Sequence, residues 1–271
     1  MMSTSVRCSG FIFDLDGTLY RGDRAIPGAP EVIRMLREVG RKVVFLSNKP
    51  LQPRESYAHK LTLLGIPAQP SDVLTSGHVL GRWLSNEAPG AHVYVLGEPP
   101  LIEELRTFGL LPSDGTGRVD FVVASFDRTI DYRKIDTAFQ ALRRGARLVA
   151  TNADRTCPVD GGEIPDAAAV IGALEGCTGR RPELVVGKPS PLMIQAALAH
   201  LGLAAQQCLV VGDRLETDIR MGREAGATTA LVLTGVTSRE SLHGLSASQL
   251  PDIVMDSVAQ LPDHILLDTE G

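Results

Sequence analysis

Short apolar segments recur along the chain, and each ends at a polar residue or a glycine. They lie at residues 11–13, 43–46, 93–96, 121–124, 148–150, 184–186, 209–211 and 231–233. Each is too short for a helix and apolar throughout, which is typical of parallel strands that are buried on both faces. The pattern therefore predicts eight buried strands.

Stretches with helical periodicity separate these segments. Residues 31–39 and 132–144 place apolar side chains on one helical face, and each stretch stops before a glycine. Residues 191–201 begin with Pro191 after Ser190, a combination that favours a helix N-terminus. Alternating strands and helices predict an α/β fold with right-handed crossovers. We expect a doubly wound, mostly parallel, Rossmann-like sheet.

The polar strand ends are not spread evenly along the chain. They cluster before residue 50 and after residue 186, whereas the middle of the chain has strand–helix units of its own. We interpret residues 1–79 and 184–271 as one discontinuous domain, and residues 80–183 as a second α/β domain inserted into it. A chain of 271 residues is long enough for two modest domains.

Composition narrows the choice of partners and compartment. Hydrophobic residues make up 44% and charged residues 22%, which excludes wholesale disorder. The net charge is −5 and no basic run occurs, so we expect no nucleic-acid partner. Four widely spaced cysteines indicate reduced thiols. With no apolar run long enough to span a bilayer and no signal-like N-terminus, we expect a cytoplasmic protein without a membrane partner.

Two carboxylates follow the first predicted strand. Asp14 and Asp16 lie in the segment Asp14-Leu15-Asp16-Gly17-Thr18. Ligands of open α/β sheets bind beyond the carboxyl ends of the strands. Adjacent carboxylates repel each other, and a hard divalent cation such as Mg²⁺ removes that cost. The alternative is a simple turn, which Asp and Gly also favour.

Further acidic residues follow a later strand. Asp213 comes directly after the segment 209–211 and Gly212, and Asp218 lies five residues further on. Asp213 could supply another metal ligand, and Asp218 could orient it or hold a metal-bound water. The alternative is the exposed start of a helix.

Two strand ends also carry groups that suit a phosphate. Ser47-Asn48-Lys49 stands at a strand-to-helix junction, where free backbone N–H groups favour an anion. Lys188 follows an apolar strand between Gly187 and Pro189. Taken singly, these features also fit helix capping and a surface lysine. Together with the carboxylates they provide what phosphoryl transfer needs: charge neutralisation, donors and a nucleophile.

In order and spacing these motifs resemble those of the haloacid dehalogenase (HAD) superfamily of phosphatases. The matching residues are Asp14, Asp16, Thr18, Ser47, Lys188, Asp213 and Asp218. The segments at 46–48, 126–128, 150–154 and 186–190 are similar to those of the NagD and p-nitrophenylphosphatase subfamily, whose large α/β cap lies between the second and third motifs. The resemblance covers nearly the whole chain.

The resemblance implies roles for the acidic residues. Asp14 would be the nucleophile that forms an aspartyl-phosphate, and Asp16 the general acid and then the general base. Mg²⁺ would be the cofactor, bound by Asp14, Asp213 and the backbone carbonyl of Asp16. Thr18 and Asp218 would support this site. An acid at position 16 argues against a dehalogenase or an ATPase-like member.

The resemblance also implies how substrate would be held. Ser47, Asn48, Lys49 and Lys188 would bind the phosphate group. The inserted cap would choose the substrate, and our candidates for contact with it are Asn152, Asp154, Arg155, Thr156 and Cys157. The pyridoxal phosphatase branch carries a histidine near position 157, so Cys157 argues against that substrate, although it could simply be a packing residue. Asp166 suits a helix N-cap.

The expected function is Mg²⁺-dependent hydrolysis of small phosphorylated metabolites, sugar phosphates first. Phosphoglycolate, nucleoside monophosphates and pyridoxal phosphate are alternative substrates. No feature of the sequence indicates a phosphomutase. A non-catalytic binding protein on this fold would be expected to lack Asp14 or Asp16. A dinucleotide-dependent oxidoreductase would need a G-x-G-x-x-G run, which does not follow the first strand. By analogy with capped relatives, the chain could form a homodimer through the cap.

Overall fold

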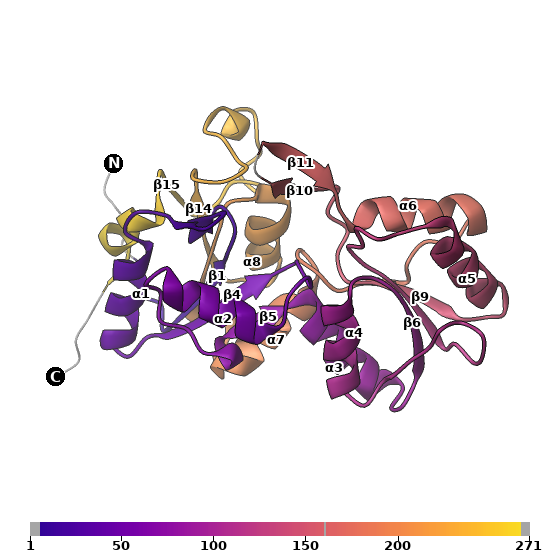
Figure 1. The fold of residues 1–271 in the computed structure, drawn as a ribbon. Helices are drawn as coiled ribbons and strands as arrows, with labels where there is room; N and C mark the ends of the chain where they lie inside the picture. The colour runs from indigo at the N-terminus through magenta and orange to yellow at the C-terminus, as the bar shows by residue number, and fades with distance from the viewer. Residues whose placement is uncertain (1–5, 160, 267–271) are drawn as a thin grey trace. The chain divides into compact units, whose positions relative to one another are not determined.

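A computed structural model describes residues 6–159 and 161–266, which form two compact units (Figure 1). We call them the outer unit and the inserted unit. Of the described residues, the outer unit comprises 6–47, 54–74 and 188–266. The inserted unit comprises residues 48–53 and 75–187. The sequence pattern does not predict that the short segment 48–53 belongs with the inserted unit.

The outer unit is built on a six-stranded sheet in the order β15-β14-β13-β1-β4-β5. The pairings from β15 across to β4 are all parallel. The elements of this unit are β1 (Gly10–Asp14), β2 (Tyr20–Arg21), β3 (Arg24–Ala25), α1 (Ala29–Glu38), β4 (Lys42–Ser47), α2 (Arg54–Leu63), η1 (Pro70–Asp72), β5 (Val73–Thr75), α7 (Pro191–Leu201), η2 (Ala205–Gln207), β13 (Cys208–Gly212), η3 (Leu215–Ile219), α8 (Arg220–Glu224), β14 (Thr228–Val232), η4 (Glu240–Leu242), β15 (Ile253–Met255) and η5 (Val258–His264).

Both faces of this sheet are covered. Phe11, Phe13 and Phe45 share one hydrophobic cluster with the buried residues of α1, α2 and η5. Successive side chains of a strand point to opposite faces, so Ile12, also buried, faces the other side. Helix α7 contacts β4 and α8 contacts β14. Apolar strands between helices are the doubly wound arrangement that the sequence predicts.

The inserted unit has a sheet of its own, in the order β12-β9-β8-β6-β7, with every pair parallel. Helices α5 and α6 lie side by side on it, as do α3 and α4 (Figure 1). The elements of this unit are α3 (Ser76–Glu87), β6 (His92–Leu96), α4 (Pro99–Thr107), β7 (Leu111–Pro112), β8 (Phe121–Ala124), α5 (Tyr132–Arg143), β9 (Arg147–Ala150), β10 (Thr156–Val159), β11 (Gly162–Pro165), α6 (Ala167–Thr178) and β12 (Leu184–Val185).

One expected boundary needs a correction. The sequence pattern assigns the strand at 184–186 to the outer domain, but β12 pairs with β9 of the inserted unit. Backbone hydrogen bonds to Ala150 and Thr151 continue this pairing through Gly187. The chain therefore leaves the inserted unit between residues 187 and 188, not before residue 184. At the start of the inserted unit, the boundary lies between residues 74 and 75 rather than between residues 79 and 80, because helix α3 belongs wholly to that unit.

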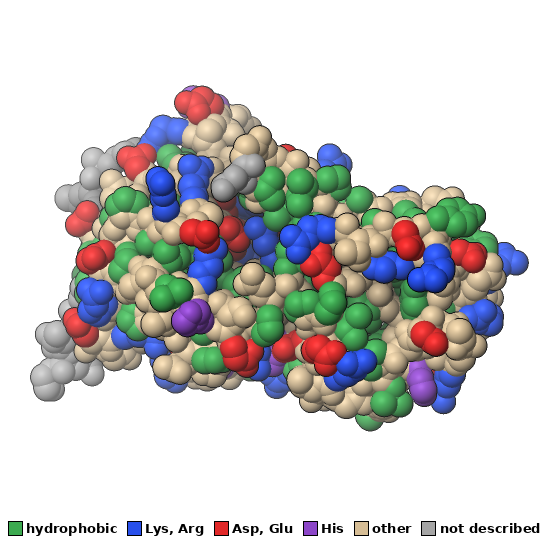
Figure 2. All heavy atoms as spheres, viewed as in Figure 1, with side chains coloured by type: hydrophobic (Ala, Val, Ile, Leu, Met, Phe, Trp, Pro, Cys, Tyr) green, Lys and Arg blue, Asp and Glu red, His purple; other side chains and the backbone are tan. Residues whose placement is uncertain are grey.

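The helix ends follow local chemistry. The side chain of Ser190 accepts a hydrogen bond from the Leu192 N–H at the start of α7, and Gly202 ends that helix in the left-handed conformation (φ 63°). Asp166 accepts from the Ala167 N–H, so it is the expected N-cap of α6. Within the described residues, no helix is both long and apolar enough to cross a membrane. The face drawn in Figure 2 carries acidic and basic side chains intermixed.

Candidate active site

Lys188 lies at the centre of a group of carboxylates in the outer unit. Its Nζ donates hydrogen bonds to Asp14 Oδ1 at 2.5 Å and to Asp218 Oδ1 at 2.7 Å. The Lys188 side chain is only 4% exposed, and that of Asp14 is 13% exposed. Thr18 Oγ1 donates to the other oxygen of Asp14, at 3.3 Å. Asp14 is thus held in place while staying partly accessible.

Asp213 joins this group from the neighbouring strand, because β13 pairs with β1 in parallel and both strands end at the same edge. The backbone N–H of Val236 donates to Asp213 Oδ2 at 2.7 Å. A Cβ at Gly17 or Gly235 would lie 2.6 or 1.8 Å from that oxygen. Only glycine leaves room for the carboxylate at these two positions.

Asp218 is buried on the turn that follows β13. This turn, η3, is π-helical, a rare geometry that is often found at functional sites. The backbone N–H of Arg214 donates to Asp218 Oδ2 at 3.3 Å, while the other oxygen accepts from Lys188. A Cβ at Gly212 would lie 2.3 Å from the Asp218 Cβ, so glycine is required there too. Asp218 therefore holds the Lys188 ammonium in place through this hydrogen bond.

The charges of this group affect one another. Burial, reinforced by Asp14 and Asp218, raises the pKa of Asp213 to about 7. Burial also raises the pKa of Asp218, against the opposing effect of Lys188. Burial alone would lower the pKa of Lys188, but the two carboxylates outweigh it and hold that pKa above its ordinary value. Lys188 is therefore a stable ammonium surrounded by excess negative charge.

The group fits a divalent cation. Oxygen atoms of Asp14, Asp213 and Asp218 all lie within 4.8 Å of one another. Three carboxylates surround one ammonium, and burial together with the charges of Asp14 and Asp218 raises the pKa of Asp213. Hard oxygen donors in small number suit Mg²⁺. Asp14 and Asp218 both accept hydrogen bonds from Lys188, and Asp14 is the more exposed of the two.

Asp16 lies outside this carboxylate group and is held by the hairpin that follows it. It forms a β-bridge with Tyr20, and the Gly17 N–H donates to the Tyr20 carbonyl at 2.8 Å. Lys60 Nζ lies 4.4 Å from the centre of the Tyr20 ring and 3.3 Å from Asp23 in the hairpin turn. Through Lys60, helix α2 thus contacts the β2–β3 hairpin that follows Asp16.

The phosphate-binding candidates divide between the units. Ser47, buried, ends β4, next to Asp14 at the end of β1, because Leu46 is the register partner of Asp14. Asn48 and Lys49 begin the segment that belongs to the inserted unit.

The candidates for substrate contact in the inserted unit differ in their surroundings. Asn152 and Asp154 are hydrogen-bonded to each other at 3.1 Å, and Asn48 bonds Asp154 at 3.0 Å. Arg155 is exposed. Thr156 and Cys157 lie on β10, where the Cys157 side chain is buried and contacts the adjacent Pro158 carbonyl at 3.6 Å. The burial of Cys157 favours the packing role that the sequence left open.

Sequence reasoning missed the loop after β14. Thr234 Oγ1 donates to the Gly17 carbonyl at 2.6 Å, Gly235 packs on Asp213, and the Val236 N–H bonds the same carboxylate. This loop shapes the Asp213 site through backbone and glycine contacts. In the sequence, this loop shows only Thr234 and Gly235 after an apolar strand, and these residue types alone do not indicate a catalytic or binding site.

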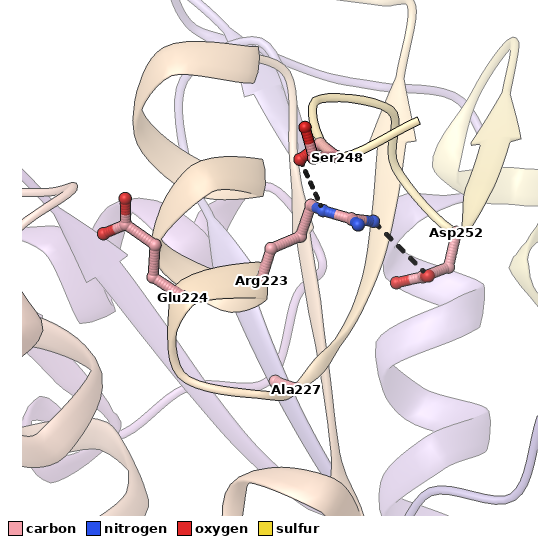
Figure 3. A pocket seen from close by; sticks show the side chains of 5 residues that line it. All are labelled: Arg223, Glu224, Ala227, Ser248 and Asp252. Atoms are coloured by element: carbon pink, nitrogen blue, oxygen red, sulfur yellow. Dashed lines mark hydrogen bonds and ion pairs between the residues drawn. The ribbon is translucent and has the colours of Figure 1, made fainter. Parts of the chain in front are cut away.

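A separate hollow of about 350 Å³ lies between α8 and the segment before β15 (Figure 3). Arg223 reaches into it, but its guanidinium donates to the backbone carbonyls of Ser248 and Leu250 and lies 3.6 Å from Asp252. These contacts tie the loop to α8. Arg223 is thus a structural residue, and the hollow is not part of the carboxylate site.

Comparison with known proteins identifies the family. A model of haloacid dehalogenase-like hydrolases matches residues 11–111, and a second, HAD-hydrolase-like model matches residues 185–261. The motifs resemble in particular the arabinose-operon sugar phosphatase of bacilli. The sugar-phosphatase AraL of Bacillus subtilis is 41% identical over 94% of this chain and 92% of that protein. The 5'-nucleotidase YutF of Bacillus subtilis is 34% identical over 94% of this chain and 98% of that protein.

Solved structures agree with the sequence relatives. A p-nitrophenyl phosphatase from Archaeoglobus fulgidus superimposes with a TM-score of 0.88 at 37% identity, covering 95% of this chain and 99% of that one. A glycerol phosphate phosphatase from Mycobacterium tuberculosis, in complex with magnesium, gives a TM-score of 0.86 at 33% identity, covering 94% and 76%. The chain therefore belongs to the haloacid dehalogenase-like hydrolases, and within that family it is a phosphatase of the NagD and p-nitrophenylphosphatase type, a phosphoric monoester hydrolase.

Proposed function

We propose that this phosphatase hydrolyses small phosphomonoesters, sugar phosphates foremost, with Mg²⁺ and through a phosphoryl group carried on Asp14. The observation that carries the proposal is the bridge from Lys188 to Asp14 and Asp218 at the carboxyl edge of a parallel sheet, beside Asp213. This arrangement presents a fixed, partly exposed carboxylate next to a buried ammonium. Such a pair suits attack on a phosphorus atom whose oxygens carry negative charge.

The first half of the reaction transfers the phosphoryl group to the protein. A carboxylate oxygen of Asp14 attacks phosphorus, and the bond from phosphorus to the ester oxygen breaks. Asp16 donates a proton to that departing oxygen, so the leaving group is released as a neutral alcohol. Lys188 orients the attacking carboxylate through its hydrogen bond to Asp14, since it is itself held by Asp218.

The second half returns the protein to its starting state. A water molecule attacks phosphorus and gives its proton to Asp16, now the base. The bond between phosphorus and the Asp14 oxygen breaks, and inorganic phosphate leaves. Ser47, together with the backbone N–H groups of Asn48 and Lys49, would hold the phosphoryl oxygens in both halves.

The metal site of this proposal consists of Asp14, Asp213 and the backbone carbonyl of Asp16, with Thr18 and Asp218 supporting it. Mg²⁺, when bound there, supplies neutralisation of the crowded carboxylates and of the phosphoryl charge. Asp213 is buried, hydrogen-bonded and kept in place by two glycines, so the protein holds this ligand ready.

The outer unit would then be the catalytic domain and the inserted unit the cap that chooses the leaving group. Asn152, Asp154, Arg155 and Thr156 are the cap candidates. The 41% identity to a sugar-phosphatase supports sugar phosphates as the first substrate class. The 5'-nucleotidase relative supports nucleoside monophosphates as the second.

The test is phosphate release from a panel of phosphomonoesters, measured with Mg²⁺ and with EDTA. The panel holds pentose, hexose and triose phosphates, phosphoglycolate, nucleoside monophosphates, pyridoxal phosphate and p-nitrophenyl phosphate. We expect metal-dependent release that is lost in Asp14→Asn, with the highest kcat/KM for a sugar phosphate. Release that survives in Asp14→Asn would refute the role of Asp14. A higher kcat/KM for a nucleoside monophosphate than for any sugar phosphate would make nucleotides the first substrate class.

A further inference from the structure

Two phosphate-binding candidates stand at the points where the chain passes between the units. Ser47 is the last residue of the outer unit before the inserted unit begins at Asn48. Lys188 is the first residue of the outer unit after the inserted unit ends at Gly187. Each therefore has a covalent neighbour that belongs to the inserted unit. Whatever holds those two neighbours constrains Ser47 and Lys188 through one peptide bond.

Asn48 is held by both its side chain and its backbone. Its Nδ2 donates to Asp154 Oδ2 at 3.0 Å, and its carbonyl accepts from the buried hydroxyl of Ser76 at 2.7 Å. Asn48 is 8% exposed and Ser76 is fully buried. Buried hydrogen bonds of this kind fix a side chain in one rotamer, because breaking them leaves polar atoms without a partner.

Gly187 lies against the same residues. Its N–H donates to the Thr151 carbonyl at 2.6 Å. A Cβ at Gly187 would meet the Asn152 Cβ, Asn48 Oδ1 and the Thr151 carbonyl, each at 2.8 Å. Two chain segments that are far apart in sequence thus pass each other at van der Waals distance, and only glycine permits this approach.

Asn152 connects these segments to the body of the inserted unit. It is 1% exposed, and its Nδ2 donates to Asp154 Oδ2 and to Asp166 Oδ1, both at 3.1 Å. Its Oδ1 accepts from the Thr151 hydroxyl at 2.9 Å. Asp166 is in turn the N-cap of α6. The contacts run without a gap from a helix of the inserted unit to the residues that adjoin Ser47 and Lys188.

We propose that Asn48, Asn152, Asp154 and Gly187 form a linker clamp, in which Asn152 and Asp154 are positioning residues for phosphoryl transfer. The clamp fixes the spacing of the two chain segments as they leave the inserted unit. It thereby sets Ser47 and Lys188 around the phosphoryl group. The inference rests on the proposed function of those two residues, and it assigns Asn152 and Asp154 a role other than contact with the leaving group.

The two roles differ in a measurable way. A residue that contacts the leaving group affects each substrate differently. A clamp acts on the phosphoryl group, which all substrates share, so its loss lowers kcat/KM by the same factor for every leaving group. It also weakens the binding of inorganic phosphate, which has no leaving group at all.

The experiment compares Asp154→Ala and Gly187→Ala with the control Asp136→Ala, an exposed aspartate on α5. We measure kcat/KM for p-nitrophenyl phosphate, a hexose phosphate and phosphoglycolate, and the Kd of inorganic phosphate by calorimetry. We expect both clamp variants to lose about 10- to 100-fold on all three substrates, in line with the cost of small misplacements in active sites. We expect Asp136→Ala to match the wild-type protein.

Two further readouts keep the outcome clear. Asp154→Asn retains a side-chain oxygen for Asn48 and Asn152, so it should recover much of the activity that Asp154→Ala loses. Thermal unfolding shows whether each variant is folded. If Asp154→Ala does not fold, Gly187→Ala provides the test of the clamp. A loss that changes the order of substrates while phosphate binding is unaltered would overturn the clamp. Wild-type protein that hydrolyses no panel member would overturn the proposed function instead, and calorimetry with phosphate would still test the clamp.

Discussion

The buried side chains of the candidate active site balance one another's charges. Lys188 is buried between Asp14 and Asp218, and Asp213 adds a third carboxylate whose oxygen lies within 4.8 Å of theirs. Buried charges are tolerated when they are paired and hydrogen-bonded, and the removal of one partner leaves the others exposed to the full cost of burial. Replacing each residue of the group should therefore have its own measurable effect on stability and activity.

Replacing the ammonium should damage both folding and catalysis. Lys188→Met preserves much of the side-chain volume but leaves Asp14 and Asp218 without their shared cation. We expect the free energy of unfolding to fall by about 3 kcal/mol, and kcat to fall by about 100-fold or more because the nucleophile loses its orientation. Urea unfolding and steady-state kinetics measure the two effects.

Lys42→Met is the matched control, since the Lys42 ammonium donates to the Leu201 carbonyl at the end of α7. We expect a change within about 1 kcal/mol. If Lys188→Met were as stable and active as this control, the charge-balance account would be wrong.

Gly235 should matter for Asp213 through space rather than through backbone freedom. A Cβ at Gly235 would lie 1.8 Å from Asp213 Oδ2, and Gly235 has no left-handed φ. Gly235→Ala should therefore displace the carboxylate and raise the Mg²⁺ concentration needed for half-maximal activity by about 10-fold, a change worth about 1.4 kcal/mol. Gly176→Ala on α6, where a Cβ meets nothing within 4 Å, is the control. An unchanged metal requirement in Gly235→Ala would contradict the placement of Asp213 as a ligand.

At the element scale, the strand ends of the outer unit do most of the positioning. Strands β1, β4 and β13 are neighbours and parallel, so the residues that follow them meet at one edge without any long-range signal in the sequence. This shared edge explains why Asp14 and Asp213 could be paired in advance. The apolar runs and the helices at 29–38, 132–143 and 191–201 could be predicted closely because periodicity and capping residues are local features of the sequence.

Other elements escaped prediction for physical reasons. Strands β5 and β15 have three residues each, too few to show a periodicity. Strand β14 starts at Thr228, earlier than expected, because Thr228 and Thr229 are polar residues that suit a strand, and the Thr229 hydroxyl bonds Asp252. The assignment of 184–186 failed because a strand run alone does not say which sheet it joins. The clamp contacts depend on side-chain geometry between distant segments, which one sequence does not reveal.

The connection between β8 and α5 offers a pH test of stability. Burial alone would raise the pKa of Asp127, but hydrogen bonds from Lys134 and Thr129 outweigh it and hold that pKa below its ordinary value. A depressed carboxyl pKa stabilises the folded state above the ordinary value, and this contribution is lost as the pH falls through the folded value. Asp127→Asn should thus cost about 1–3 kcal/mol at pH ~7.

The difference between wild-type protein and Asp127→Asn should shrink as the pH falls below ~4. Urea unfolding at a series of pH values measures it, with Asp136→Asn as the exposed control. A difference that stays constant down to strongly acidic pH would show that the Asp127 carboxylate is not the source of the stability.

In the whole molecule, the two units would have different roles. The carboxylate group, Lys188 and Ser47 belong to the outer unit, and in the proposed function they act on the phosphoryl group. Residues of the inserted unit would differ among themselves: Asn152 and Asp154 as clamp residues, and Arg155 as a contact to the leaving group. A cap that selects by such contacts can change its substrate without changing the chemistry.

Arg155→Ala should accordingly alter the order of substrates. Loss of an exposed guanidinium should lower kcat/KM for phosphoglycolate, whose leaving group carries a carboxylate, by about 10-fold relative to p-nitrophenyl phosphate. The ratio of the two kcat/KM values is the measurement, and Arg181→Ala, an exposed cation at the end of the same unit, is the control. An equal fall for both substrates would assign Arg155 to positioning instead.

In the proposed mechanism, Asp14 carries the phosphoryl group and Asp16 moves the proton. The most direct test uses Asp16→Asn with p-nitrophenyl phosphate, whose leaving group departs without protonation, whereas attack by water still needs a base. We predict a burst of one nitrophenolate per protein molecule, followed by slow turnover, and after acid quench a phosphoryl group on the peptide that contains Asp14. Absence of the burst, or a phosphoryl group on another residue, would contradict the mechanism.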